Sequence, residues 1–361
     1  MTSLSTVPRK GMPDPHLSKS EFLRRFRSQF SDPVFEALAG ELDRIAAAAW
    51  DAYAAGRKSP RTRKAGPQFA DPDYELSVDW IAAREAILRA QRRHDDPNGP
   101  ACVLLINGST RSEHTCPGEM SKSYRLLSLA RNVLMQDPHV QIEVLDLSRL
   151  ASEYGRHIHP CKGCFSTAAP LCHWPCSCYP NYSLGQTHDW MNEIYPQWVA
   201  AHGVMIITPV HWFHGSSPLK LMMDRLVCAD GGNPDPTRTH GKDAQAAKGL
   251  ELGGWDYQRP LEGRLFACIV HGDAEGAQAA RRDICDWLSS LHLVPADVSA
   301  TLDRYIGYWR PYATSHLELD ADEALQLEVR DAALTLLAGV RNMRQGRRGA
   351  PHRKVKPPRD K

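Results

Sequence analysis

Residues 107–112 (NGSTRS) have the side chains of an anion-binding loop. They combine a glycine, several hydroxyl groups and Arg111, and a helix is predicted to begin shortly afterwards. Backbone N–H groups at a helix start attract anions, and an arginine can hold two phosphate oxygens at once. The same composition is typical of a helix N-cap, so phosphate binding and helix capping both stay open. No P-loop and no G-x-G-x-x-G motif is present, which excludes these two nucleotide-binding loops.

Two further segments have the composition of ligand-binding loops. Residues 208–218 (TPVHWFHGSSP) place Trp212 and Phe213 between two histidines. Such aromatic side chains could form a flat wall for a planar heterocycle, or they could fill core volume under the loop. Residues 270–276 (VHGDAEG) place His271 and Asp273 next to glycines, which let a ligand approach the backbone closely.

The chain has ten cysteines, and five of them lie between residues 161 and 178. These five are Cys161, Cys164, Cys172, Cys176 and Cys178, spaced C-x2-C-x7-C-x3-C-x-C. In a cytosolic protein, such crowding is more typical of metal or redox chemistry than of structural disulfides. The thiolates could hold an iron–sulfur cluster or zinc, or the thiols could be buried without a metal. The spacing matches neither a common iron–sulfur pattern nor a paired zinc ribbon, so all three alternatives stay open.

Alternating strands and helices are predicted from residue 101 onward, and these elements position the loops. Strands are predicted at 102–106, 140–145, 204–207 and 265–270 with a short fifth near 294–298, and helices at 123–135, 189–201, 219–227, 275–291 and 322–342. The main strands are nearly continuous apolar runs, which is typical of a parallel sheet buried on both faces. The predicted fold class is α/β, a three-layer open sandwich. Ligands bind such sheets beyond the carboxyl ends of the strands, where the three polar segments fall.

The regions that flank this predicted domain show no motif that indicates chemistry. We expect a disordered tail at 1–17, a helical extension at 18–98, the main domain at 99–343 and a disordered basic tail at 344–361. The basic tail has a net charge of +7, which leaves −5 on residues 1–343, so the main body is not of the nucleic-acid-binding kind. The sequence has no long apolar run and no secretory signal. It therefore predicts no membrane partner and a cytoplasmic location.

Four short motifs follow one another within the predicted sheet domain. They are Gly108-Ser109-Thr110-Arg111, Ser121-Lys122-Ser123, Thr208-Pro209-Val210-His211-Trp212, and Lys220 followed by Asp224-Arg225. In this order they resemble the NADPH-dependent FMN reductase branch of the flavodoxin-like superfamily, over residues 101–300. The resemblance implies a flavodoxin-like, five-stranded parallel sheet of order 2-1-3-4-5 and a non-covalently bound FMN.

The resemblance also implies a role for individual residues. The FMN phosphate would be held by Ser109, Thr110, Arg111, Ser121 and Ser123. The isoalloxazine would be lined by Pro209, Val210, His211, Trp212 and Phe213, and its other edge would be approached by His271, Gly272 and Asp273. His271, as the catalytic residue, and the backbone of residues 209–213 would act electrostatically near N1 and O2, where the reduced ring carries negative charge. The chain departs from the family's pattern in two ways: the stretch from Arg111 to Ser121 is longer, and a histidine precedes the aromatic residue, so Trp212 or His211 would stack on the ring.

The function that follows from the resemblance is an FMN-dependent oxidoreductase. It would transfer electrons from NAD(P)H through FMN to a flavin, a quinone or another small acceptor. The resemblance further implies a homodimer. Two other functions stay open: an iron–sulfur flavoprotein that carries electrons to a protein partner, and a non-enzymatic binding module stabilised by a metal.

Overall fold

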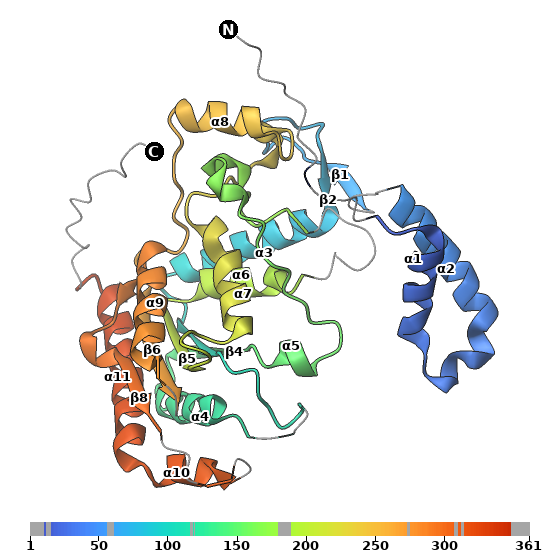
Figure 1. Cartoon of the computed structure of the whole chain (residues 1–361). Helices are drawn as coiled ribbons and strands as arrows, with labels where there is room; N and C mark the ends of the chain where they lie inside the picture. Colours follow the sequence, from blue (N-terminus) through green and yellow to red (C-terminus); the bar gives the residue numbers. More distant parts are fainter. Residues whose placement is uncertain are drawn as a thin grey trace. The chain divides into compact units, whose positions relative to one another are not determined.

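A computed structural model of the chain describes residues 11, 16–55, 61–115, 118, 120–179, 189–272, 275–306, 310–311 and 314–347 (Figure 1). Most of the two expected tails, and Asp273, lie outside these residues. The described residues form two compact units, and the division along the chain falls between Pro60 and Arg61. The larger unit, called the sheet unit below, begins at Arg61.

The N-terminal unit consists of helices, as predicted. Helix α1 (Lys19–Arg27) and helix α2 (Ala39–Ala54) are joined by the 3-10 turns η1 (Ser28–Phe30) and η2 (Pro33–Leu38). The Ser18 side chain caps α1 by accepting a hydrogen bond from the Glu21 backbone N–H at 3.3 Å. The ring of Phe22 in α1 packs against the ring of Tyr53 in α2, with 4.8 Å between the ring centroids.

The sheet unit is built on parallel strands. They are β3 (Ala101–Asn107), β4 (Val140–Asp146), β5 (Gly203–Pro209), β6 (Leu265–Gly272), β7 (Val294–Pro295) and β8 (Thr301–Tyr305). Their order across the sheet is β4-β3-β5-β6-β7, and β8 also pairs with β6. Numbered along the chain, the first five strands have the order 2-1-3-4-5, so the predicted flavodoxin-like topology is confirmed.

The fifth strand position differs in detail from the prediction. A strand was expected near 294–298, but β7 ends at Pro295. Asp297 then caps the short turn η7 (Val298–Ala300) by accepting a hydrogen bond from the Ser299 backbone N–H at 3.1 Å. The chain returns to the edge of β6 as β8. The short strands β7 and β8 therefore pair with successive parts of β6, where one strand was expected. The side chain of Asp297 interrupts the strand because it offers the backbone a turn instead of the sheet ladder.

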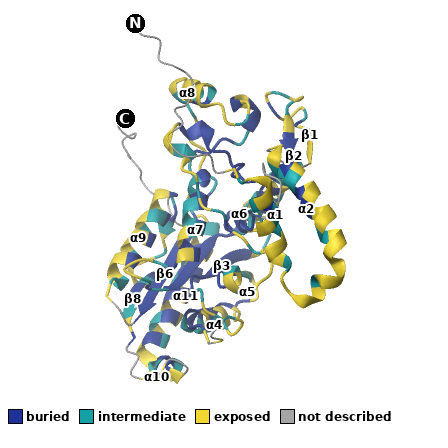
Figure 2. Ribbon diagram, turned by 45° about the vertical axis from the view of Figure 1, so that its right-hand side comes forward, coloured by how far each residue is buried: buried dark blue, intermediate teal, exposed yellow. Residues whose placement is uncertain are grey.

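Two hydrophobic cores cover the two faces of the sheet, because alternate residues of each strand point to opposite faces. One core joins Leu104 and Ile106 of β3 to helices α3 (Val78–Asp95), α6 (Met191–Ala200), α7 (Ser217–Arg225) and α9 (Ala277–Ser290). The other joins Val103 and Leu105 to helices α4 (Lys122–Leu134) and α11 (Glu323–Arg344). Strands β3, β5 and β6 are accordingly buried between the helices (Figure 2), and the predicted three-layer architecture is confirmed.

Helix α3 belongs to the sheet unit, although the sequence placed it in the helical extension at 18–98. Ile87 and Ala90 of α3 are part of the core that contains α6, so the packing of α3 ties it to the sheet. The domain boundaries themselves stay a prediction. The remaining elements of this unit are β1 (Thr62–Lys64), β2 (Glu75–Ser77), α5 (Arg149–Ser152), η3 (Cys164–Ser166), η4 (Ala169–Leu171), η5 (Leu226–Ala229), η6 (Pro236–Thr239), α8 (Ala244–Leu252) and α10 (His316–Ala321). None of the described helices is both long and apolar enough to cross a bilayer.

Candidate functional site

The loops that follow β3, β5 and β6 meet at the carboxyl edge of the sheet. The Gly108 backbone N–H donates to the Ile207 carbonyl at 2.8 Å, and the Val210 backbone N–H donates to the His271 carbonyl at 2.8 Å. A Cβ atom on Gly108 would lie 2.7 Å from the Thr208 side chain, and one on Gly272 would collide with Val210 Cγ1. Both glycines therefore allow a contact between neighbouring loops that a larger residue would prevent.

The first loop is folded by its own side chains. Asn107 Oδ1 accepts a hydrogen bond from the Ser109 backbone N–H, and Ser109 Oγ accepts one from the Arg111 backbone N–H, both at 3.1 Å. Ser109 is buried, Thr110 is half-buried and Arg111 is exposed. These contacts hold the 109–111 backbone beside the end of β3 and leave the arginine side chain at the surface.

The start of helix α4 lies in the same region. The Ser121 side chain caps α4, because its Oγ accepts a hydrogen bond from the Tyr124 backbone N–H at 3.2 Å. Helix capping is thus carried by Ser121 and not by residues 107–112. The hydroxyl proton of Ser121 can still be donated to an anion. Ser123 is fully buried and bonds to His271, so its hydroxyl faces the strand end as well as the helix.

His271 is a buried histidine with one unpartnered nitrogen. Its Nε2 lies 2.8 Å from Ser123 Oγ, whereas its Nδ1 has no hydrogen-bond partner. Burial, followed by the electrostatic effects of Lys122 and His211, lowers the pKa of His271 to about 3. The ring is therefore neutral near pH 7. Buried polar atoms without a partner are uncommon, so Nδ1 is an unsatisfied polar atom at the end of β6.

A tight turn presents two aromatic side chains at the end of β5. The His211 backbone N–H donates to the His214 carbonyl at 2.7 Å, and the reverse bond measures 2.9 Å. Trp212 and Phe213 between them both have left-handed backbones, with φ of 48° and 70°. Such turns normally use asparagine or glycine, so this one is strained, by about 1–2 kcal/mol for each residue.

The two aromatic side chains do not fill the core. Trp212 is 91% exposed and Phe213 is 56% exposed. The sequence left open whether these side chains form an exposed wall or fill core volume under the loop. In the structure they form an exposed wall. Gly276 before helix α9 makes room for the turn, because a Cβ atom there would lie 2.6 Å from Phe213 Cα. His211 is half-buried, and burial, followed by the positive charge of Arg111, lowers its pKa.

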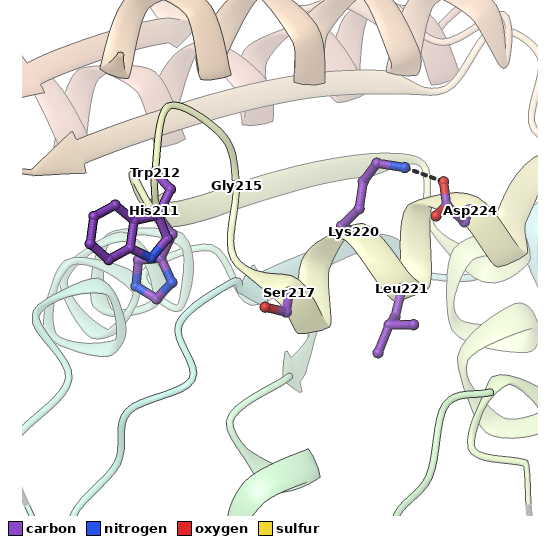
Figure 3. Close-up of a pocket in the computed structure, with 7 residues that line it drawn as sticks. All are labelled: His211, Trp212, Gly215, Ser217, Lys220, Leu221 and Asp224. Carbon is purple, nitrogen blue, oxygen red and sulfur yellow. Dashed lines mark hydrogen bonds and ion pairs between the residues drawn. The ribbon is translucent and has the colours of Figure 1, made fainter. Parts of the chain in front are cut away.

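A cavity of about 420 Å³ borders this turn (Figure 3). It is lined by His211, Trp212, Gly215, Ser217, Lys220, Leu221 and Asp224. Lys220 and Asp224 form an ion pair on its wall. Pro209 and Val210 lie at the base of the same loop, half-buried and buried, and connect the turn to β5. The volume of the cavity is in the range typical of small-molecule sites.

Arg225, the last residue of the fourth motif, is turned away from this cavity. It forms an ion pair with Asp189 in which both side chains are fully buried. Its Nη1 donates to the His159 carbonyl at 2.9 Å, and its guanidinium lies 4.7 Å from the centroid of the Tyr179 ring. Arg225 therefore anchors the cysteine-rich segment and does not contact the loop edge.

The cysteine-rich segment does not form a metal site among the described residues. No group of three or more His, Cys, Asp or Glu side chains there is arranged to hold a metal ion, so of the three alternatives that the sequence leaves open, neither the iron–sulfur cluster nor zinc is supported. The thiols instead contact one another in pairs: Cys164 with Cys172 and with Cys178, Cys176 with Cys178, and Cys172 with Cys228. Cys161 bonds to the Gly163 backbone N–H at 3.3 Å. The described cysteines are all free thiols.

Two residues of the quoted segments, Ser216 and Gly276, shape the loop edge through contacts that the sequence did not indicate. Ser216 is buried, caps α7 and donates a hydrogen bond to the Gly108 carbonyl. Its position before Ser217-Pro218 is a recognisable helix-start signal, but the contact across the sheet has no signal in the sequence. Gly276 was included in the third segment, but its contact with Phe213 was not foreseen.

The family model described as NADPH-dependent FMN reductase matches residues 102–304. None of the curated proteins compared matches the chain.

Solved structures were also compared. The chain is similar to RosB with a bound 8-demethyl-8-formylriboflavin-5'-phosphate intermediate (14% identity, TM-score 0.48, 69% of this chain and 82% of that one). It is similar to an FMN-dependent NADH-azoreductase from Bacillus anthracis in complex with FMN (15%, 0.36, 65% and 99%). It is also similar to the NAD(P)H:acceptor oxidoreductase FerB from Paracoccus denitrificans (13%, 0.34, 66% and 98%). Since the family model spans more than half of the chain, this protein belongs to the NADPH-dependent FMN reductase family and is an NAD(P)H-dependent FMN oxidoreductase.

Proposed function

We propose that FMN binds where the loops after β3, β5 and β6 meet, and that electrons pass from NAD(P)H to a flavin, a quinone or another small acceptor. One observation carries the proposal: a strained turn exposes Trp212 and Phe213 at the same sheet edge at which buried His271 Nδ1 has no partner. A flat ring with polar edges would cover the aromatic side chains and satisfy the nitrogen.

The phosphate of the cofactor would lie at the first loop and the start of α4. Ser109, Thr110 and Ser121 offer hydroxyl donors, and Arg111 offers a bidentate cation. The α4 N-terminus adds free backbone N–H groups and a partial positive charge. Ser123 is buried and already bonded to His271, so we expect it to orient that histidine more than to contact the phosphate.

The ring of the cofactor would lie between the 211–214 turn and the end of β6. FMN, when bound, supplies the redox chemistry by accepting a hydride from the nicotinamide and giving two electrons to the acceptor. His271 is neutral near pH 7, because its pKa is lowered to about 3. When Ser123 donates its hydroxyl proton to Nε2, the ring proton is held on Nδ1 and can be donated to the ring edge. The glycine at position 272 keeps this strand end close to Val210.

The cavity beside the turn is the place that we propose for the second ring, that of the nicotinamide or of the acceptor. It adjoins His211 and Trp212, so a planar molecule in it would lie next to the same aromatic wall. The homodimer that the resemblance implies stays a prediction, which sedimentation would test.

The decisive experiment is an anaerobic titration of the FMN-loaded protein with NADPH, followed by flavin absorbance. We expect one equivalent of NADPH to bleach the bound flavin and an added quinone to restore the colour. The Arg111→Ala variant should hold FMN about tenfold more weakly or worse, because a charge-assisted contact is lost, while Arg92→Ala, an exposed arginine on α3, should bind as the wild type does. Flavin that NADPH leaves oxidised, or equal affinity in Arg111→Ala, would contradict the proposal.

A further inference from the structure

Five thiols form a contact chain in the sheet unit outside the cavity described above. This thiol cluster consists of Cys164, Cys172, Cys176, Cys178 and Cys228. Cys164 packs against the core cluster that contains the other four cysteines, and side-chain hydrogen bonds link its thiol to those of Cys172 and Cys178. None of the five lines the cavity beside the 211–214 turn. The redox function at the sheet edge therefore leaves the cluster unexplained.

Access and charge within the cluster are unequal. Cys164 is half-buried, whereas the other four thiols are buried. Lys242 Nζ lies 3.7 Å from Cys164 Sγ and donates to the Leu171 carbonyl at 2.7 Å. A neighbouring cation and donated hydrogen bonds stabilise a thiolate, which is the reactive form of cysteine. A small oxidant would thus meet an activated sulfur at Cys164 before it meets the others.

The segment that carries these thiols is held firmly in place. Arg225 binds the His159 carbonyl, the Trp80 indole N–H donates to the Pro175 carbonyl at 2.8 Å, and the Trp174 backbone N–H donates to the Asn233 carbonyl at 2.8 Å. These contacts, together with the hydrogen bond from the Asn233 backbone N–H to the Cys172 carbonyl at 2.7 Å, hold the backbone between Cys172 and Cys176 in place. The pairing therefore does not depend on a chance encounter of mobile cysteines.

The structure pairs Cys164 with other cysteines than the one that the sequence suggests. Cys161-Lys162-Gly163-Cys164 has the C-x-x-C spacing of thiol-exchange motifs. In the structure, however, Cys161 Sγ bonds to the Gly163 backbone N–H, and the thiols in contact with Cys164 are those of Cys172 and Cys178. The partner of Cys164 is thus distant in the sequence and adjacent in space.

We propose that Cys164 is an oxidation site for hydroperoxides and closes a reversible disulfide with Cys172 or Cys178. The Cys164 thiolate attacks a peroxide oxygen, so that an S–O bond forms, the O–O bond breaks and the released hydroxide takes a proton to become water. The neighbouring thiol then attacks the sulfenic sulfur, so that the S–S bond forms, the S–O bond breaks and hydroxide leaves with the thiol proton as water. Two thiols lose two electrons, and hydrogen peroxide becomes two water molecules.

The experiment uses the full-length, FMN-loaded protein and hydrogen peroxide at one equivalent per chain. We expect the loss of about two thiols per chain, a peptide map that links Cys164 to Cys172 or Cys178, and full recovery with dithiothreitol. Cys164→Ser should abolish this fast loss. Cys161→Ser is the matched control, because it removes the neighbouring half-exposed thiol and should leave the disulfide unchanged.

A measurement on the wild-type protein tests the proposal without relying on the folding of a variant. The reduced wild type, treated with one equivalent of iodoacetamide, should be alkylated first at Cys164, and the alkylated protein should form no disulfide with peroxide. A link between Cys161 and Cys164, a fast loss that persists in Cys164→Ser, or tightly bound zinc or iron with an unreactive Cys164 would each overturn the proposal.

Discussion

Replacing Trp212 with asparagine separates the backbone strain of the 211–214 turn from the proposed stacking of Trp212 on FMN. The tryptophan has a left-handed backbone with φ of 48°, a conformation that costs an ordinary residue about 1–2 kcal/mol and that asparagine adopts more readily. Its side chain is 91% exposed, so the substitution removes little buried area, on the order of 20 Å² or about 0.5 kcal/mol. The folded protein without FMN should therefore become more stable by roughly 0.5–1 kcal/mol.

FMN binding should respond in the opposite direction. Loss of an aromatic ring that stacks on a planar ligand costs about 1–3 kcal/mol, which weakens binding by about tenfold or more. Thermal melts without FMN should show a rise of about 1–3 °C, and fluorescence titration should show the weaker FMN binding. Trp212→Phe is the control, because it keeps both the strain and the aromatic wall.

Two results would refute this reasoning about Trp212. A less stable Trp212→Asn protein would mean that the turn is not strained. Unchanged FMN affinity would mean that Trp212 does not stack on the ring, which would leave His211 as the stacking residue.

Three further predictions follow from the packing of the site and its surroundings. Gly272→Ala should weaken FMN binding and destabilise the fold by about 1–3 kcal/mol, because its Cβ would collide with Val210; adding Val210→Ala should recover part of the loss in denaturant titrations, and no recovery would disprove the steric cause. Arg225→Met should destabilise by about 3–5 kcal/mol, because it leaves Asp189 charged and buried; the double variant with Asp189→Leu should be more stable than Arg225→Met alone, and equal stability would argue against the ion pair. The pKa of His271 is lowered from 6.5 to about 3 in the folded protein. The contribution of its neutral ring to the free energy of unfolding is therefore present above pH 6.5 and is lost as the pH falls, by about 2 kcal/mol between pH 7 and 5. His271→Gln should lose correspondingly less stability over that interval, and an equal loss would contradict the lowered pKa.

The sheet and the edge at which its polar loops meet could be predicted because they depend on local patterns. Strands buried on both faces must be apolar throughout, so β3, β5 and β6 are visible as apolar runs. The loops after them meet because carboxyl ends of parallel strands lie at one edge. Ser109 and Arg111 were placed correctly on the first loop by the same reasoning.

The parts that could not be predicted depend on contacts between distant residues. Left-handed backbones at Trp212 and Phe213 contradict local preference, so no propensity indicates them. Arg225 belongs to the fourth motif, but its charge is paired with Asp189, which lies 36 residues earlier in the sequence. Cys228 lies outside the crowded cysteine segment, and only the fold brings it to Cys172.

The position of FMN in a crystal structure of the complex tests the central claim most directly. We predict electron density for the phosphate beside Ser109, Arg111 and the start of α4, with the isoalloxazine against the 211–214 turn and His271 Nδ1 bonded to the ligand. Density for FMN elsewhere, or a phosphate with no contact to the first loop, would contradict the account.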